Sequence, residues 1–113
     1  MTEDKSYLKY YNYLSRTFGR VDCTGCLQLA HILDMFQLGD RLMDVYSKYA
    51  EEISSTPVAV ERNLRTYISV IMRDLTMEDI SRIFNYEFRP DQTRVTLSEF
   101  VPVAKMFIDS LED

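Results

Sequence analysis

The sequence predicts a compact all-α domain of five to six helices that contains a helix-turn-helix. The 113-residue chain holds three glycines and three prolines, too few for the many turns of a β-sandwich. Apolar residues instead recur at helical spacing in successive segments, with short polar stretches between them. One such stretch ends in Thr56-Pro57, a pair typical of a helix start and of the turn within a helix-turn-helix.

Three helices are expected in the first half of the chain, at about residues 3–18, 24–37 and 40–53. Each segment has apolar side chains three and four residues apart, which gives a helix one face to bury. Gly19 and Gly39 follow the first two segments. Glycine favours a helix end because it adopts the left-handed conformation without strain.

Three more helices are expected in the second half. The longest covers about residues 57–75, with Thr56 as its N-cap. Residues 76–79 and 96–99 resemble capping boxes, in which a threonine and an acidic side chain each bind a backbone N–H at a helix start. They predict a short fifth helix and a final sixth helix, joined by an ordered loop over residues 85–95.

The helix-turn-helix is expected over about residues 44–73. In this motif the first helix braces the DNA backbone and the second lies in the major groove. Ala50 is small where the two helices cross, and Ile53 and Val60 are expected to pack between them. Ser54 occupies the turn position where glycine is common. Any pair of helices with a short polar turn mimics this pattern, so the motif alone does not establish DNA binding.

The outer face of the second motif helix carries the candidate base-reading residues. Glu61, Arg62 and Arg65 lie away from its apolar stripe. A planar guanidinium group pairs with O6 and N7 of guanine, and a glutamate accepts a hydrogen bond from N4 of cytosine. The alternative is a solvated face on which Glu61 and Arg65, four residues apart, form an ion pair.

Net charge counts against nucleic acid, because the chain carries −5 with a pI near 4.8 and DNA-binding domains are usually basic. The charge is unevenly distributed, however. Between residues 56 and 73 the only acid is Glu61, against Arg62, Arg65 and Arg73. A local basic face is therefore compatible with an acidic protein. No apolar run approaches the ~20 residues that span a bilayer, so we expect a cytoplasmic protein with no membrane partner.

Several segments resemble a known family. Residues 55–65, 80–86 and 96–101 are similar to the C-terminal DNA-binding effector domain of the stage-zero sporulation response regulator, and their register holds without a gap. Residues 25–29 fit the start of that family's second helix. The resemblance covers about residue 8 to the end of the chain and is strongest from Tyr46 onward.

The resemblance implies a six-helix transcription regulator that binds double-stranded promoter DNA, often as head-to-tail pairs. Glu61, Arg62 and Arg65 match family positions used at base edges. Thr56 matches a turn residue near the phosphates, and Arg94 matches a basic loop residue that meets the backbone. The predicted contacts to the DNA backbone are those of Thr56, Thr66, Ser69, Arg89 and Arg94.

Departures from the family pattern support a second hypothesis. Val58 and Ala59 stand where polar and basic residues are family-like, Thr66 replaces a histidine, and Glu51 and Glu52 replace a lysine pair. The connection between the second and third helices is also shorter. These changes suit a degenerate relative that acts as a protein-interaction module without binding DNA, and that pairs with a full-length regulator or a second copy.

We expect one domain over residues 1–113, with no receiver domain and hence no phosphorylation control by that route. We also expect no enzymatic activity, cofactor or metal. Cys23 and Cys26 form a CxxC, but zinc needs two more ligands and His31 is the only histidine. Two reduced thiols at a helix start, one of them partly buried, are the simpler interpretation. His31 lies among apolar residues and is interpreted as a partly buried, hydrogen-bonded side chain.

Overall fold

A computed structural model describes residues 5–19, 23–89 and 91–111. These residues form an all-α domain with no strand in the described ranges, as the sequence predicts. The helices are α1 Leu8–Phe18, α2 Thr24–Met35, α3 Leu42–Glu52, α4 Pro57–Ile71, α5 Met77–Phe84 and α6 Leu97–Ser110.

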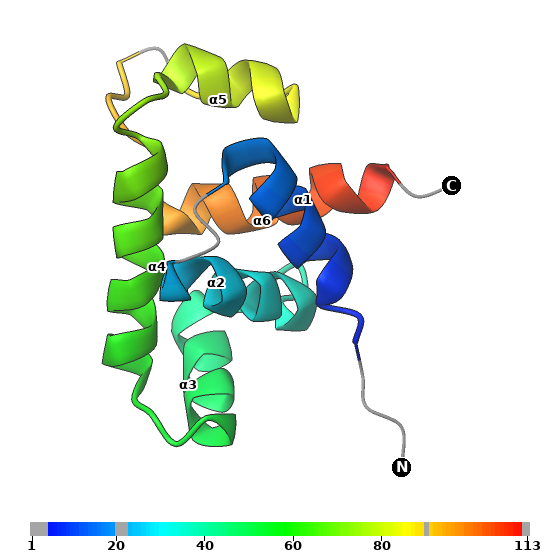
Figure 1. The fold of residues 1–113 in the computed structure, drawn as a ribbon, viewed down its shortest axis with the longest axis vertical. Helices are drawn as coiled ribbons and strands as arrows, with labels where there is room; N and C mark the ends of the chain where they lie inside the picture. Colours follow the sequence, from blue (N-terminus) through cyan, green and yellow to red (C-terminus); the bar gives the residue numbers. More distant parts are fainter. Residues whose placement is uncertain (1–4, 20–22, 90, 112–113) are drawn as a thin grey trace.

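Helix α4 runs along one edge of the molecule (Figure 1). α3 and α5 lie at its two ends, and α2 and α6 pack against its inner side. α1 covers α2 and α6. One face of α4 is therefore buried by three helices, while the opposite face has no helix over it (Figure 1).

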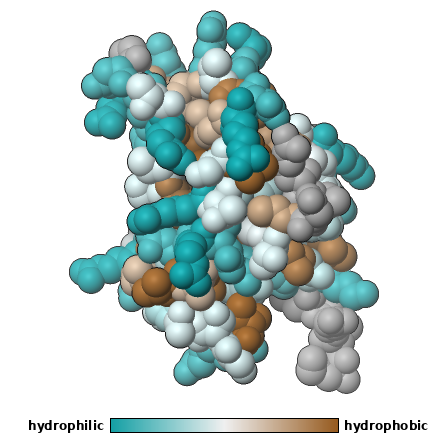
Figure 2. Space-filling view, turned by 60° about the vertical axis from the view of Figure 1, so that its left-hand side comes forward, coloured by the Kyte–Doolittle hydropathy of each residue, from teal (hydrophilic) through white to brown (hydrophobic). Residues whose placement is uncertain are grey.

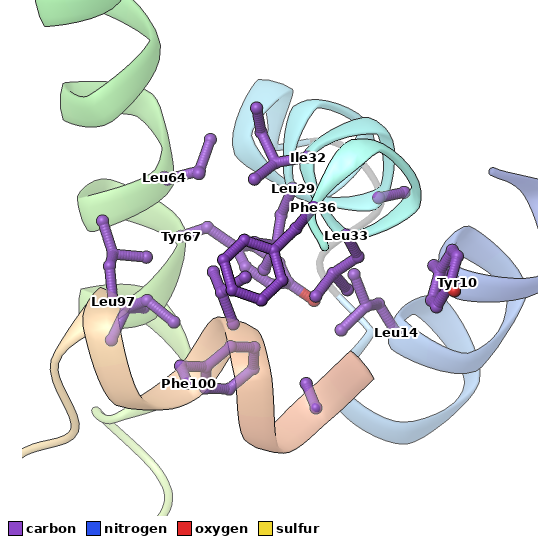
Figure 3. Packing of buried hydrophobic residues seen from close by; sticks show 14 of the residues in the cluster. Tyr10, Leu14, Leu29, Ile32, Leu33, Phe36, Leu64, Tyr67, Leu97 and Phe100 are labelled. Carbon is purple, nitrogen blue, oxygen red and sulfur yellow. The ribbon is translucent and has the colours of Figure 1, made fainter. Parts of the chain in front are cut away.

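The core lies where α1, α2, α4 and α6 meet (Figure 3). Leu64 and Tyr67 of α4 point toward Leu29 and Ile32 of α2, and Phe100 of α6 closes the cluster from below. Full burial of each such side chain stabilises the fold by about 1.5–3 kcal/mol. The core thus fixes the rotation of α4 about its own axis, which decides which of its residues face solvent.

Gly25 allows α2 to approach α4 closely. A Cβ atom at this position would lie 2.3 Å from the carbonyl oxygen of Asn63 and 2.7 Å from Cβ of Tyr67. The Asn63 side chain donates a hydrogen bond to Gln28 of α2 at 3.0 Å, beside this contact. α4 is thereby held at its middle as well as along its apolar stripe.

Several predicted helix ends differ in the structure: α3 spans Leu42–Glu52 where the sequence predicts residues 40–53, and α4 ends at Ile71 where it predicts residue 75. α1 begins at Leu8, and residues 3 and 4 of the predicted segment lie outside the described residues. Gly19 ends α1 with φ +71°, as predicted, but α2 already ends at Met35, so Gly39 (φ +95°) belongs to the following turn. The Phe36 backbone is extended there, which stops the helix without glycine.

One predicted capping box is confirmed and the other is wrong. The Thr76 hydroxyl accepts from the Asp79 amide, and the Asp79 carboxylate accepts from the Thr76 amide, at the start of α5. At the start of α6 the Thr96 side chain accepts from no backbone amide. Its hydroxyl donates instead to the Glu99 carboxylate, which also accepts a hydrogen bond from Gln92.

The residues of the CxxC and the histidine take structural positions. Cys26 is buried, Cys23 is half-buried, and both are free thiols. His31 stacks between Tyr7, at 3.9 Å between ring centroids, and Tyr49, at 5.3 Å. No group of three or more His, Cys, Asp or Glu residues in the described ranges is placed to hold a metal ion.

Candidate nucleic-acid interface

The start of α4 is fixed by local chemistry. The Thr56 hydroxyl accepts a hydrogen bond from the Ala59 amide at 3.1 Å, and Pro57 occupies the first helical position. Proline fits there because its missing N–H has no partner in a first turn. The predicted N-cap is therefore confirmed, and the first turn of α4 is held rigidly at the surface.

The turn between α3 and α4 covers residues 53–56. The Ser55 amide donates to the carbonyl of Ala50 at 2.8 Å, and Ser54 adopts a positive φ of 56°. Val60 packs between the two helices as predicted, but Ile53 does not: its side chain is 39% exposed. α3 ends at Glu52, so Ile53 leaves the helical path and points away from the core.

The outer face of α4 presents the three predicted base-reading side chains. Arg62 is exposed and forms no ion pair with any residue in the described ranges. Arg65 binds Glu61 at 3.2 Å, and its side chain is 70% exposed. Exposed pairs of this kind are worth only about 0–1 kcal/mol, so Arg65 remains available to a stronger anionic partner.

A loop arginine joins this face from outside α4. The Arg94 guanidinium donates to the Ser69 hydroxyl at 2.8 Å, which holds the loop before α6 against the last turn of α4. Arg73, in the turn that follows α4, is also exposed. Arg73 was not among the predicted contacts, although its spacing of four residues from Ser69 and eleven from Arg62 marks the same helical face.

We call the surface formed by Arg62, Arg65, Ser69, Arg73 and Arg94 the arginine face. The other residues predicted to contact the DNA backbone, Thr56, Thr66 and Arg89, lie outside this face or are engaged within the protein. The Thr66 hydroxyl donates to the carbonyl of Arg62 at 3.0 Å, and Thr56 is occupied as the cap. Arg89 is exposed in the loop between α5 and α6, where its amide binds Gln92.

Figure 2 turns the α4 side of the molecule forward. Hydrophilic side chains cross the middle of this face, and hydrophobic groups are visible both above and below them. Val58, on the first turn of α4, is 64% exposed. Glu51 and Glu52 are exposed at the end of α3. The arginine face is thus bordered by an apolar and acidic rim at the start of α4.

A groove opens beside the arginine face, between α3, α4 and the start of α6. Its volume is about 690 Å³. Tyr46 forms part of its wall, and burial, followed by the negative charge of Glu61, raises the pKa of this phenol to about 12, while Arg65 acts to lower it. Tyr46 is consequently a neutral hydrogen-bond donor at physiological pH.

Comparison with known families identifies the domain. The sequence matches the family described as "Sporulation initiation factor Spo0A C terminal" over residues 29–108. The chain belongs to this family. Searches of curated proteins and of solved structures give no match.

The Spo0A C-terminal family is the DNA-binding effector domain of a sporulation regulator, and it is not an enzyme family. The match spans all of α3, α4 and α5, together with the loop that carries Arg94. The predicted family and the all-α class are therefore confirmed. In the part of the chain that the structure describes, every helix is too short or too polar to traverse a bilayer.

Proposed function

We propose that this domain is a sequence-specific transcription regulator that inserts the first half of α4 into the major groove of double-stranded DNA. Glu61, Arg62 and Arg65 contact base edges. Arg94 and Ser69 contact the backbone, together with Thr56, Thr66 and Arg89. The domain acts in the cytoplasm, and two copies bind neighbouring sites on one duplex.

The arginine face is the observation that carries this proposal. The outer face of α4 presents Arg62 and Arg65, Arg73 follows in the turn after the helix, and Arg94 is hydrogen-bonded to Ser69 on α4. The buried side of α4 packs in the core, which fixes the orientation of the helix, so the arginines need little reorganisation to meet a duplex. Arginine also binds phosphate and guanine through two parallel hydrogen bonds, which gives both register and discrimination.

Glu61 has two roles in this proposal. In the free domain its carboxylate orients Arg65 through the 3.2 Å ion pair. In the complex the same carboxylate accepts from a cytosine amino group, while Arg65 turns to a guanine or a phosphate. The Arg65 side chain is 70% exposed and that of Glu61 28%, and ion pairs near the surface are weak, so the exchange costs little.

Single substitutions of the readers test the proposal. Arg62→Gln and Arg65→Gln should each weaken binding to a selected duplex by about 1–3 kcal/mol, or roughly 5- to 150-fold, and relax one base preference. Fluorescence anisotropy at moderate salt measures both effects. Arg82→Gln is the matched control, because Arg82 is equally an exposed helical arginine but lies on α5, paired with Glu78 and Asp79.

If both reader variants bind the duplex as tightly as the parent, the assignment of α4 as the reading helix is wrong. Both variants should stay folded, because the two side chains are exposed and their loss leaves the core intact. Circular dichroism of each variant checks this.

The second candidate is a protein-interaction module, favoured by the 64% exposure of Val58 at the start of α4. An apolar first turn beside Glu51 and Glu52 suits a protein partner better than a phosphate. Such a module pairs with a full-length regulator of the same family. Val58→Ser separates the two functions because it removes the apolar contact without adding charge: it should weaken protein pairing and leave DNA affinity nearly unchanged, whereas Arg62→Gln should weaken DNA binding alone.

A further inference from the structure

The groove beside the arginine face has the chemistry of a small-anion site. Two guanidinium groups, Arg65 and Arg94, line it against one carboxylate, Glu61. The hydroxyls of Ser69, Thr96 and Ser98 are further lining groups. The groove therefore carries an excess of positive charge, with hydrogen-bond donors on several sides.

The N-terminus of α6 forms one wall of this groove. Residues 96–98 line it, and the Thr96 side chain caps no backbone amide. The first amides of a helix lack partners within it and favour a negative group. Glu99, the acid of this first turn, binds Gln92 and Thr96 and does not line the groove.

A buried phenol supplies the second, independent observation. Only 2% of the surface of Tyr46 is exposed, and its hydroxyl has no hydrogen-bond partner among the residues that the structure describes. An unmade hydrogen bond of this kind costs about 1–3 kcal/mol. Tyr46 lines the groove, and the charges of Glu61 and Arg65 act on its phenol. A ligand that separates Arg65 from Glu61 reaches this hydroxyl, a donor that no described residue of the free domain satisfies.

The groove is also partly apolar. Leu42, Ile68, Val95 and Leu97 contribute to its lining. Inorganic phosphate alone leaves these groups without contacts, whereas an organic anion covers them. The volume of the groove, about 690 Å³, falls within the 300–1,000 Å³ that is usual for small-molecule sites.

We propose that this groove binds a small organic phosphate, with the phosphoryl group between Arg65, Arg94 and the start of α6, and the apolar body against Ile68 and Leu97. Bound ligand engages Arg65 and Arg94, two side chains that the proposed function assigns to DNA. The ligand and the duplex therefore compete, and the competition rests on that proposed function. The binding of the ligand does not.

Titration of the isotope-labelled 113-residue chain with phenyl phosphate, followed by NMR, tests the proposal. We expect saturable shifts confined to Arg65, Ile68, Ser69 and residues 94–98, which line the groove. Inorganic phosphate should bind several-fold more weakly because it lacks the apolar body. Arg94→Gln should weaken phenyl phosphate by about tenfold, since charge-assisted hydrogen bonds to phosphate are the strong ones. Tyr46→Phe should weaken it less, and Arg82→Gln should leave it unchanged.

Shifts that do not saturate, or that spread equally to Arg82 and its neighbours, overturn the groove as a site. Thermal unfolding of Arg94→Gln and Tyr46→Phe establishes that the variants are folded. A second arm adds phenyl phosphate to the domain bound to its selected duplex. Ligand binding without release of DNA contradicts only the competition, and failure to bind any duplex contradicts only the proposed function.

Discussion

At the scale of single residues, the position of a residue in the helical repeat decides whether its side chain is exposed or buried. Arg62 and Arg65 reach solvent because the apolar stripe of α4 takes up the opposite side of the helix. His31 shows the converse case. It lies on the half-buried side of α2, and its ring fills the space between Tyr7 and Tyr49. Its charge state is consequently set by burial.

Stability should fall as pH drops below about 6.5, because burial lowers the pKa of His31 from its ordinary value of 6.5, although Asp34 and Glu52 oppose the shift. The unfolded chain then binds a proton before the folded chain does, so acid favours unfolding. His31→Phe keeps the stack and removes the titrating group. Urea unfolding at pH 7.5 and 5.5 should show a smaller loss for the variant than for the parent. An equal loss in both would assign the acid sensitivity to other groups.

At the scale of helices, the two predicted capping boxes have the same three-residue spacing, and what separates them is a competing group from outside the motif. The box at α5 uses Thr76 and Asp79 alone. At α6, Gln92 from the preceding loop binds Glu99 and changes the outcome. Sequence periodicity similarly predicts that Val60 is buried, but it misses Ile53 because α3 ends one residue earlier than expected.

Thr76→Ala and Thr96→Ala should differ in their cost. Loss of the Thr76 cap removes a hydrogen bond to a backbone amide, so the free energy of unfolding should fall by about 1 kcal/mol. Thr96 makes no such bond, and its loss should cost less than half as much. Chemical denaturation of the two variants measures the difference. A larger loss for Thr96→Ala would show that this residue caps α6 in solution.

At the scale of the whole molecule, the net charge of −5 opposes the arginine face. The arginines are clustered on one face, which offsets the negative net charge there only in part. Glu51 and Glu52 lie at the end of α3, close to where α4 begins. The helices and the outward direction of the α4 arginines follow from sequence periodicity. The groove does not, since it joins α3, α4 and residues 94–98, which no local pattern relates.

Glu51→Lys should raise DNA affinity and steepen its salt dependence by about one unit of log K against log salt, because it adds about one phosphate contact. Glu51 shares a surface hollow with Ser55 and Pro57, beside the start of α4. Glu87→Lys makes the same charge change near the end of α5 and serves as the control. Anisotropy titrations over a range of salt concentrations report both slopes. Equal slopes for the two variants would remove the α3–α4 turn from the interface.

Selection of bound oligonucleotides from a random pool, carried out at two salt concentrations, tests the α4 interface most directly. The parent domain should enrich one motif that persists at the higher salt. Arg62→Gln should lose its preference at one or two positions of that motif. Recovery of no motif at either salt, or of the same motif from parent and variant, would contradict the assignment of α4 as the reading helix.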